Sequence, residues 1–248
     1  MNKILLAVDI GNTNITLGVF AGDVLKAKFK IPSVKKNYTS DLKKIFSRHH
    51  CDCVIICSVV PAATCIFTKS LKQFLSRKPY VLGQNCKVPI KNAYRFPKQV
   101  GQDRLVNAYA AIKIFGAPAI VIDFGTAVTF DIISSQGAYL GGMIIPGMRI
   151  SLEALKEKTA LLPGLKVQAP KEFIGRDTKN SILSGIVNGF GSLTDALVEK
   201  INKELKISPY VIGTGGDIGL ISSYCRVIKY LDSDLTLKGL FLIFKTIQ

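Results

Sequence analysis

The sequence has no long apolar run. Its longest uninterrupted runs, such as residues 239–244 and 119–122, fall far short of the roughly 18 apolar residues that a membrane helix needs. Near the N-terminus, only residues 4–8 resemble the apolar part of a secretion signal, and Asp9 interrupts them before any small-residue cleavage site. We therefore expect no membrane span and a cytoplasmic location.

Acidic residues are scarce. The chain has 17 aspartates and glutamates against 33 lysines and arginines, and its formal net charge is +16. Such a charge suits a nucleic-acid binder or a protein that handles anionic substrates. The lysines are scattered, however, and Lys26, Lys28 and Lys30 alternate with apolar residues as on the wet face of a strand. We therefore favour a solvated basic surface over a nucleic-acid footprint.

A second pair of metal-binding residues is missing. Residues 49–53, "HHCDC", contain both histidines of the chain, but a closed zinc site usually draws on two separated pairs and no second pair follows at a suitable spacing. Cys53 and Cys57 lie within the run "CVIICSVV", in which a free cysteine acts as a small hydrophobic residue. We therefore favour packing over metal binding, and reduced thiols over disulfides.

Two related signatures are present. "LLAVDIGNTNITLGVF" and "AIVIDFGTAVTFDII" each run from an apolar strand into Asp-x-Gly and a polar residue, and then into a second strand-like run. Their aspartates, Asp9 and Asp123, are 114 positions apart, so an internal duplication is the economical explanation. We expect an α/β protein with lobes at residues 1–115 and 116–248, and a ligand in the cleft between them.

The two Asp-x-Gly turns have a chemical interpretation. Gly11 and Gly125 permit tight turns and a close approach of the backbone to a ligand. The polar residues beside them can donate hydrogen bonds to phosphate oxygens, and the carboxylates can hold cations. Such turns also end strands without any ligand, but the matched pair favours a clamp for a nucleoside triphosphate. The polar residues are Asn12, Thr13 and Thr126, and the carboxylates are Asp9 and Asp123.

Asp103 has two interpretations. It lies in the segment "GQDR", just before an apolar, alanine-rich helix expected at residues 105–115. Near a helix N-terminus the macrodipole favours a charged carboxylate. The residue types alone fit a helix N-cap and a catalytic carboxylate equally well.

A stripe of small residues marks the helix expected at residues 178–205. Ser181, Gly185 and Gly189 fall at i, i+4 and i+8, so they share one face of that helix. Such a face lets another helix pack closely. That second helix belongs either to another copy of the chain or to the same chain.

The order of the motifs resembles that of a known family. "DIGNTN", "VGQDRLVNA", "DFGTAVTFD", "GGMIIPGM", "LLP" and "GTGGD" occur as in type III pantothenate kinases, and the resemblance extends from Asp9 to about Gly239. It implies two duplicated lobes of ribonuclease-H-like topology, as in the actin-like ATPase and sugar-kinase superfamily. It also implies ATP-dependent phosphorylation of the primary hydroxyl of pantothenate, the first step towards coenzyme A. The family is a homodimer that uses magnesium and potassium or ammonium.

The resemblance also implies roles for residues. Asp103 is the expected catalytic base, and Thr178 reaches the substrate from the neighbouring subunit. Asp9 lies near magnesium, Asp123 binds the monovalent cation, and Thr126 touches ATP. The segment "GTGGD" backs onto the nucleotide, unless it is a plain strand-ending turn. The phosphate loop for ATP comprises Asp9, Ile10, Gly11, Asn12, Thr13, Asn14, Ile15 and Thr16, and the pantothenate pocket comprises Tyr94, Gly101, Gln102, Asp103 and Arg104.

Two other functions fit the same fold. One is a nucleotide-binding module without catalysis, because this fold also hosts ATPase switches. The adjacent Asp103 and Arg104 argue against it, since a pure switch needs no base for an acceptor hydroxyl. The other is a basic transcriptional regulator, which predicts a salt-sensitive DNA complex and no turnover.

Overall fold

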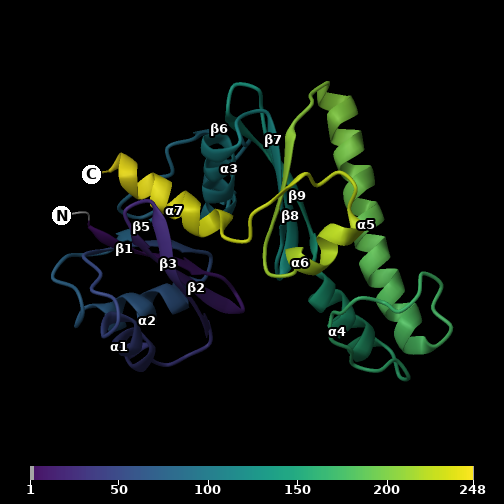
Figure 1. Cartoon of the computed structure of the whole chain (residues 1–248), viewed down its shortest axis with the longest axis horizontal. Helices are drawn as coiled ribbons and strands as arrows, with labels where there is room; N and C mark the ends of the chain where they lie inside the picture. Colours follow the sequence, from purple (N-terminus) through teal and green to yellow (C-terminus); the bar gives the residue numbers. More distant parts are fainter. Residues whose placement is uncertain (1–2, 248) are drawn as a thin grey trace. The chain divides into compact units, whose positions relative to one another are not determined.

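The computed structural model describes residues 3–247, and Figure 1 shows its elements along the chain. The chain divides into two compact units. The first unit combines the described residues up to Lys113 with those from Leu235 onward, and the second unit is Ile114–Asp234. Each unit has its own buried apolar cluster.

The sheet of the first unit follows the order β3-β2-β1-β4-β5. β1, β2 and β3 form the predicted antiparallel meander, whereas β4 and β5 run parallel to β1. The elements of this unit are β1 (Ile4–Ile10), β2 (Asn14–Ala21), β3 (Val24–Pro32), α1 (Thr39–Phe46), β4 (Cys53–Ser58), α2 (Pro61–Leu71), β5 (Tyr80–Val81), β6 (Lys91–Asn92), the short 3-10 turn η1 (Pro97–Gln99), α3 (Gln102–Ile114) and α7 (Leu235–Thr246).

β1 is buried on both faces, which explains its continuous apolar sequence. Leu6 and Val8 join the cluster that includes residues of α1 and α2. Leu5 and Ala7 join the cluster that includes residues of α3 and α7. Because alternate residues of a strand face opposite sides, a strand covered on both sides needs apolar residues at successive positions.

The second unit repeats this plan. Its strands follow the order β9-β8-β7-β10-β11, with an antiparallel meander of β7, β8 and β9 and with β10 and β11 parallel to β7. The matching order confirms the predicted duplication. The elements are β7 (Ala119–Phe124), β8 (Ala127–Ile133), β9 (Ala138–Pro146), α4 (Met148–Lys158), α5 (Thr178–Leu205), β10 (Tyr210–Thr214), α6 (Ile218–Ile221), the 3-10 turn η2 (Ser222–Tyr224) and β11 (Tyr230–Leu231).

The division of the chain differs from the expected lobes at the C-terminal end. The expected second lobe comprises all of residues 116–248, but α7 belongs to the first unit. Leu237, Leu240 and Ile243 of this helix are buried with Leu5 of β1. The other face of the first sheet thus gains its cover from a segment that is distant in sequence, which local patterns do not reveal.

α5 begins and ends at the predicted residues. Asp177 caps its N-terminus, because its carboxylate accepts the N–H of Asn180 at 2.8 Å, and Lys206 ends it with a φ of 52°. Among the described residues, this helix alone is long and apolar enough to cross a membrane by length and composition. Its buried side chains, Val187 and Val198 among them, belong to the core of the second unit.

Candidate functional site

The first Asp-Gly turn, residues 9–16, connects β1 to β2. The N–H of Gly11 donates to the carbonyl of Asn14 at 3.0 Å and closes the turn. Ser33, just after β3, holds it from outside: its hydroxyl donates to the carbonyl of Gly11 at 2.5 Å, and its N–H donates to the carbonyl of Thr13 at 3.1 Å. Asn12 and Thr13 remain exposed, so a ligand at the surface can reach the turn.

Asp9 lies at the end of β1, next to β4. In the parallel register Asp9 is opposite Cys57, and the N–H of Val59 donates to the carbonyl of Ile10 at 3.2 Å. No group of three or more His, Cys, Asp or Glu side chains in the described part of the chain could hold a metal ion. Mg²⁺ usually takes only one or two carboxylates together with phosphate oxygens and water. The single carboxylate of Asp9, beside a turn suited to phosphates, therefore fits magnesium bound with a nucleotide.

Asp103 lies in the first turn of α3, one residue after the helix begins. Its Oδ1 accepts the N–H of Arg104 at 2.9 Å. The same oxygen lies so close to Gly101 that a Cβ atom there would collide with it. An N-cap residue precedes the helix and accepts an N–H two or three residues further on. Asp103 does neither, so the N-cap interpretation is wrong.

The surroundings of Asp103 disfavour its charge. Burial raises the pKa of its carboxyl group above the ordinary value, and the N–H and positive charge of Arg104 counteract this only in part. Desolvation of this kind makes a carboxylate a stronger proton acceptor than an ordinary aspartate. A shift of this sign is typical of a general base, whereas an ion pair alone would lower the pKa of a carboxyl group.

Cys57 lies near two of the carboxylates of the first unit, those of Asp9 and Asp103. Burial raises the pKa of its thiol well above the ordinary value, and the negative charges of Asp9 and Asp103 raise it further. Both carboxylates therefore lie near the same buried sulfur. Val59 lies in the same region, because its Cγ1 is 3.7 Å from the position of a Cβ atom at Gly101. The fold thus brings the first Asp-Gly turn and the start of α3 together at the ends of β1 and β4.

The second Asp-Gly turn, residues 123–126, connects β7 to β8. The N–H of Gly125 donates to the carbonyl of Ala127 at 3.2 Å, and the N–H of Gly147 donates to the carbonyl of Thr126 at 3.0 Å. A Cβ atom at Gly147 would lie 2.5 Å from the carbonyl oxygen of Gly125, a distance that no side chain tolerates. The start of α4 is therefore packed directly on this turn.

The glycine loop, residues 214–217, lies against the same turn. Gly215 has a φ of 98°, and its Cα passes so close to Asp123 that a Cβ atom would collide with Oδ1. The carbonyl of Phe124 accepts the N–H of Asp217 at 3.1 Å. The loop therefore does more than end a strand, because its backbone packs against the Asp123 carboxylate. Carboxylate and carbonyl oxygens are the ligands that hard cations prefer.

The other predicted site residues lie in both units. Gln102 touches the Gly83 turn, where a Cβ atom would lie 3.3 Å from its Cδ. Tyr94 is half-buried after β6, and its N–H donates to Oδ1 of Asn92 at 3.0 Å. Thr178 is the exposed first residue of α5 in the second unit. The structure thus places Gly101–Arg104 beside the first Asp-Gly turn, and Thr178 in the unit that carries the second.

The two glycines of the small-residue stripe on α5 face open space, whereas the Ser181 hydroxyl donates to the carbonyl of Gly175 at 3.1 Å. Ser181, Gly185 and Gly189 are exposed, and no heavy atom lies within 4 Å of a Cβ atom placed at Gly185 or Gly189. The alternative in which this stripe packs against another helix of the same chain is therefore wrong for the residues that the structure describes. The interpretation as a seam between two copies remains a prediction.

Two residues that support the Asp-Gly turns, Gly147 and Ser33, are not among the predicted site residues. Gly147 lies within the quoted segment "GGMIIPGM", so its Pro-Gly pair was a usable signal for a turn. Ser33 has no comparable signal, because its two hydrogen bonds to the first Asp-Gly turn depend on the pairing of β2 with β3. Cys53 and Cys57 are buried in β4, in agreement with the predicted packing role.

Comparison with known sequences gives one family. The profile of the family named type III pantothenate kinase matches residues 5–224. A type III pantothenate kinase from Finegoldia magna is 40% identical over 256 residues, which cover 98% of this chain and 97% of that protein. Both similarities include the two Asp-Gly turns and the start of α3.

Comparison with solved structures confirms the fold. A protein from Campylobacter jejuni assigned to the Baf family of transcriptional activators has a TM-score of 0.62 at 21% identity, over 98% of each chain. The activator of 2-hydroxyisocaproyl-CoA dehydratase from Clostridium difficile, solved with bound ADPNP, has a TM-score of 0.58 at 11% identity, over 98% of this chain and 96% of that chain. At such identities the likeness concerns the fold alone, which is the predicted α/β fold of two ribonuclease-H-like lobes.

Proposed function

The chain belongs to the type III pantothenate kinase family, and from this premise we propose that it uses ATP to phosphorylate the primary hydroxyl of pantothenate, the first step towards coenzyme A. The observation that carries the proposal is the position of Asp103. Its partly buried carboxylate, with a raised pKa, lies near the end of β1, where the first Asp-Gly turn begins. A proton acceptor beside a phosphate-binding turn is what a kinase for an alcohol needs. The cytoplasmic location belongs to the same proposal.

In the proposed reaction Asp103 receives the proton of the acceptor hydroxyl. The hydroxyl oxygen attacks the γ-phosphorus, the bond from that phosphorus to the bridging oxygen of ATP breaks, and ADP leaves. Arg104, which is buried beside Asp103, offers a fixed positive charge suited to an anionic acceptor or to the charge that develops on the phosphoryl group. Gly101, Gln102 and Tyr94 form the rest of the proposed pantothenate pocket.

The two Asp-Gly turns are proposed to bind the nucleotide. Residues 9–16 and Thr126 would supply polar groups to its phosphates, and Asp9 would hold a magnesium ion, which would supply positive charge against the phosphates. The ordered hydrogen bonds from Ser33 and Gly147 support this role, because a turn that is already fixed loses little entropy on binding. A positively charged surface also favours the approach of two anionic substrates.

The proposal is tested by measuring ADP release with ATP, magnesium and pantothenate. We expect turnover with pantothenate and little with other hydroxylated small acids. Nucleotide binding without turnover on any of these acids would favour the non-catalytic module. A salt-sensitive gel shift with DNA, again without turnover, would favour the transcriptional regulator.

A monovalent cation is proposed at Asp123. The carboxylate lies near the end of β7, and the backbone of Gly215 packs against it. We expect ADP release to be low in sodium or Tris buffer and to increase about 10-fold with potassium or ammonium. Asp123→Ala should respond to neither ion. Equal activity of the wild type in all four buffers would remove this site from the mechanism.

A homodimer is proposed through the stripe on α5, with Thr178 completing the acceptor pocket of the partner. Gly185→Leu should yield a monomer of 27.0 kDa in light scattering and increase the KM for pantothenate at least about 5-fold. Leucine favours a helix more than glycine does, so the variant should stay folded.

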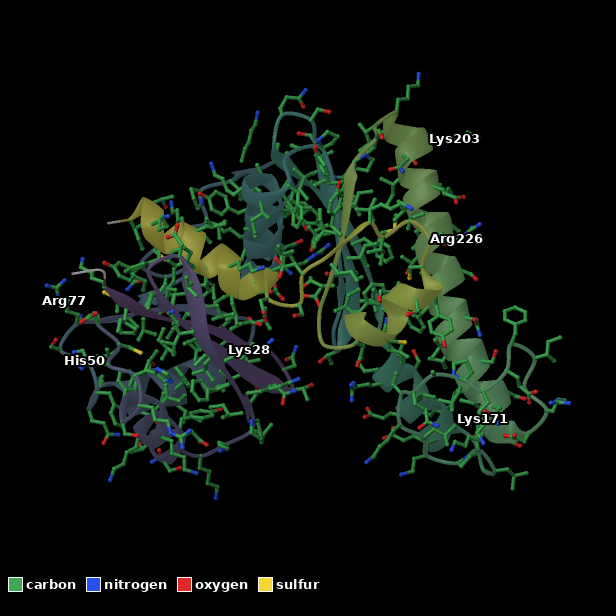
Figure 2. All side chains as sticks on the ribbon, viewed as in Figure 1. Lys28, His50, Arg77, Lys171, Lys203 and Arg226 are labelled. Carbon is green, nitrogen blue, oxygen red and sulfur yellow. The ribbon has the colours of Figure 1, made fainter. Side chains whose placement is uncertain are left out.

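The control for this variant is Lys203→Leu. Figure 2 shows Lys203 at the far end of α5. At the usual rise of an α-helix, Lys203 is about 27 Å along α5 from Gly185. Lys203→Leu introduces the same side chain into the same helix and should leave both the dimer and the KM for pantothenate unchanged. A wild-type protein that is monomeric and fully active would refute the shared pocket.

A further inference from the structure

Arg149 and Asp217 form an ion pair next to the second Asp-Gly turn. Nε of Arg149 donates to Oδ2 of Asp217 at 3.2 Å, and an Nη atom donates to Oδ1 at 2.5 Å. The side chain of Asp217 is 8% exposed, whereas that of Arg149 is 64% exposed. The hydrogen bond to Asp217 is the main reason why the pKa of Arg149 is raised. The pair therefore neutralises a carboxylate that the fold has removed from water.

Asp217 links this arginine to the glycine loop, which packs against the Asp123 carboxylate. Its N–H donates to the carbonyl of Phe124 at 3.1 Å, and its own carbonyl accepts the N–H groups of Leu220 and Ile221, each at 3.1 Å. It is thus the anchor between the end of β7 and the start of α6. Two residues earlier in the glycine loop, Gly215 packs on Asp123.

Arg149 is itself fixed close to the same turn. It is the second residue of α4, and Gly147, just before this helix, donates to the carbonyl of Thr126. The start of α4 therefore contacts the second Asp-Gly turn through Gly147 and the glycine loop through Arg149. A planar guanidinium that binds both oxygens of a carboxylate fixes direction as well as distance.

We propose that Arg149 is a positioning residue for nucleotide binding, which holds the glycine loop against Asp123 through Asp217. The inference rests on the proposed nucleotide site and extends it to a residue that contacts neither Asp123 nor Thr126 in any described hydrogen bond or ion pair. Without Arg149, the buried carboxylate of Asp217 loses its cationic partner and is drawn towards water. The glycine loop then moves away from Asp123, and the second Asp-Gly turn loses its packing contact with Gly215.

The second unit contains a matched control. Nε of Arg226 donates to Oδ2 of Asp195 at 2.9 Å, and again an arginine that is 84% exposed covers an aspartate that is 5% exposed. Figure 2 shows Arg226 beside the middle of α5. Asp195 also accepts the N–H groups of Arg226 and Val227, so this pair fastens a loop to α5 and does not involve the glycine loop.

The test compares Arg149→Met with Arg226→Met, which remove the same charge and keep a side chain of similar length. For each we would measure the melting temperature, the KM for ATP and for pantothenate, kcat, and the Kd of a non-hydrolysable ATP analogue by calorimetry. We expect Arg149→Met to increase the KM for ATP and the Kd about 10-fold, with a smaller change in kcat. Arg226→Met should lose comparable stability and keep wild-type nucleotide binding, and Arg149→Lys should recover part of the loss.

A double-mutant cycle separates positioning from direct contact. If Arg149 acts through Asp217, its replacement by Met should have little further effect on the Kd once Asp217→Asn is present. A full effect in that background would mean that Arg149 binds the nucleotide itself, and the inference would be overturned. So would a wild-type Kd for Arg149→Met. If the wild type binds nucleotide but does not phosphorylate pantothenate, the proposed reaction fails while these binding data still decide the role of Arg149.

Discussion

Asp103→Asn is expected to reduce turnover of ATP and pantothenate by about 10²- to 10⁴-fold and to leave the Kd for nucleotide almost unchanged. A primary hydroxyl is a poor nucleophile at neutral pH, and the amide keeps the shape of the carboxylate without its capacity to accept a proton. Turnover and nucleotide affinity are measured separately, by ADP release and by calorimetry.

The same variant should not be less stable than the wild type. Burial raises the pKa of Asp103 in the folded state, so any stabilisation by this group is present below the unfolded pKa and is lost as the pH rises through the folded pKa. Where this carboxylate is ionised, it therefore lowers the free energy of unfolding relative to its protonated form. Asparagine removes that charge, so an equal or higher melting temperature is expected, the usual trade of stability for function at an active site.

The pH profile gives a further check on Asp103. Because the base must be deprotonated, the acid limb of kcat should lie at a higher pH than the ordinary pKa of an aspartate predicts. Asp23→Asn is the matched control, since Asp23 is exposed and pairs only at the surface with Lys245. Near-normal turnover of a folded Asp103→Asn protein would remove Asp103 as the base.

The sequence was sufficient for the parts of the fold that depend on local patterns. Strands β1 and β7 are continuous apolar runs because successive residues of each strand are buried, and each run is interrupted by an aspartate near its end. The duplication followed from these two interruptions. α5 was predictable to its last residue because Asp177 and Thr178 mark its start and apolar residues recur at helical spacing along it.

The remaining features depend on contacts between distant segments. α7 has an ordinary apolar helix pattern, which does not state that it covers the sheet of the first unit. Arg149 is one of 33 basic residues, and nothing near it in sequence points to Asp217. Asp103 was ambiguous because N-caps and catalytic carboxylates both occur at helix starts. Because its Oδ1 accepts the N–H of Arg104 and lies close to Gly101, Asp103 does not act as an N-cap.

Gly215→Ala is expected to destabilise the protein by about 2–4 kcal/mol, because alanine rarely adopts a φ near 98° and its Cβ atom would lie 2.6 Å from two backbone atoms of Phe124. Phe124 cannot give way easily, since β7 is paired with β8 on one side and with β10 on the other. For a chain of this size, such a loss lowers the melting temperature by about 5–15 °C.

The neighbouring glycine provides the control for this prediction. A Cβ atom at Gly216 would meet no heavy atom within 4 Å, so Gly216→Ala should melt within a few degrees of the wild type. The collision at Gly215 also reaches Oδ1 of Asp123, so only Gly215→Ala should weaken the response to potassium and increase the KM for ATP, by about 10-fold. Equal melting temperatures and equal KM values for the two variants would show that the glycine loop does not hold the Asp123 carboxylate in place.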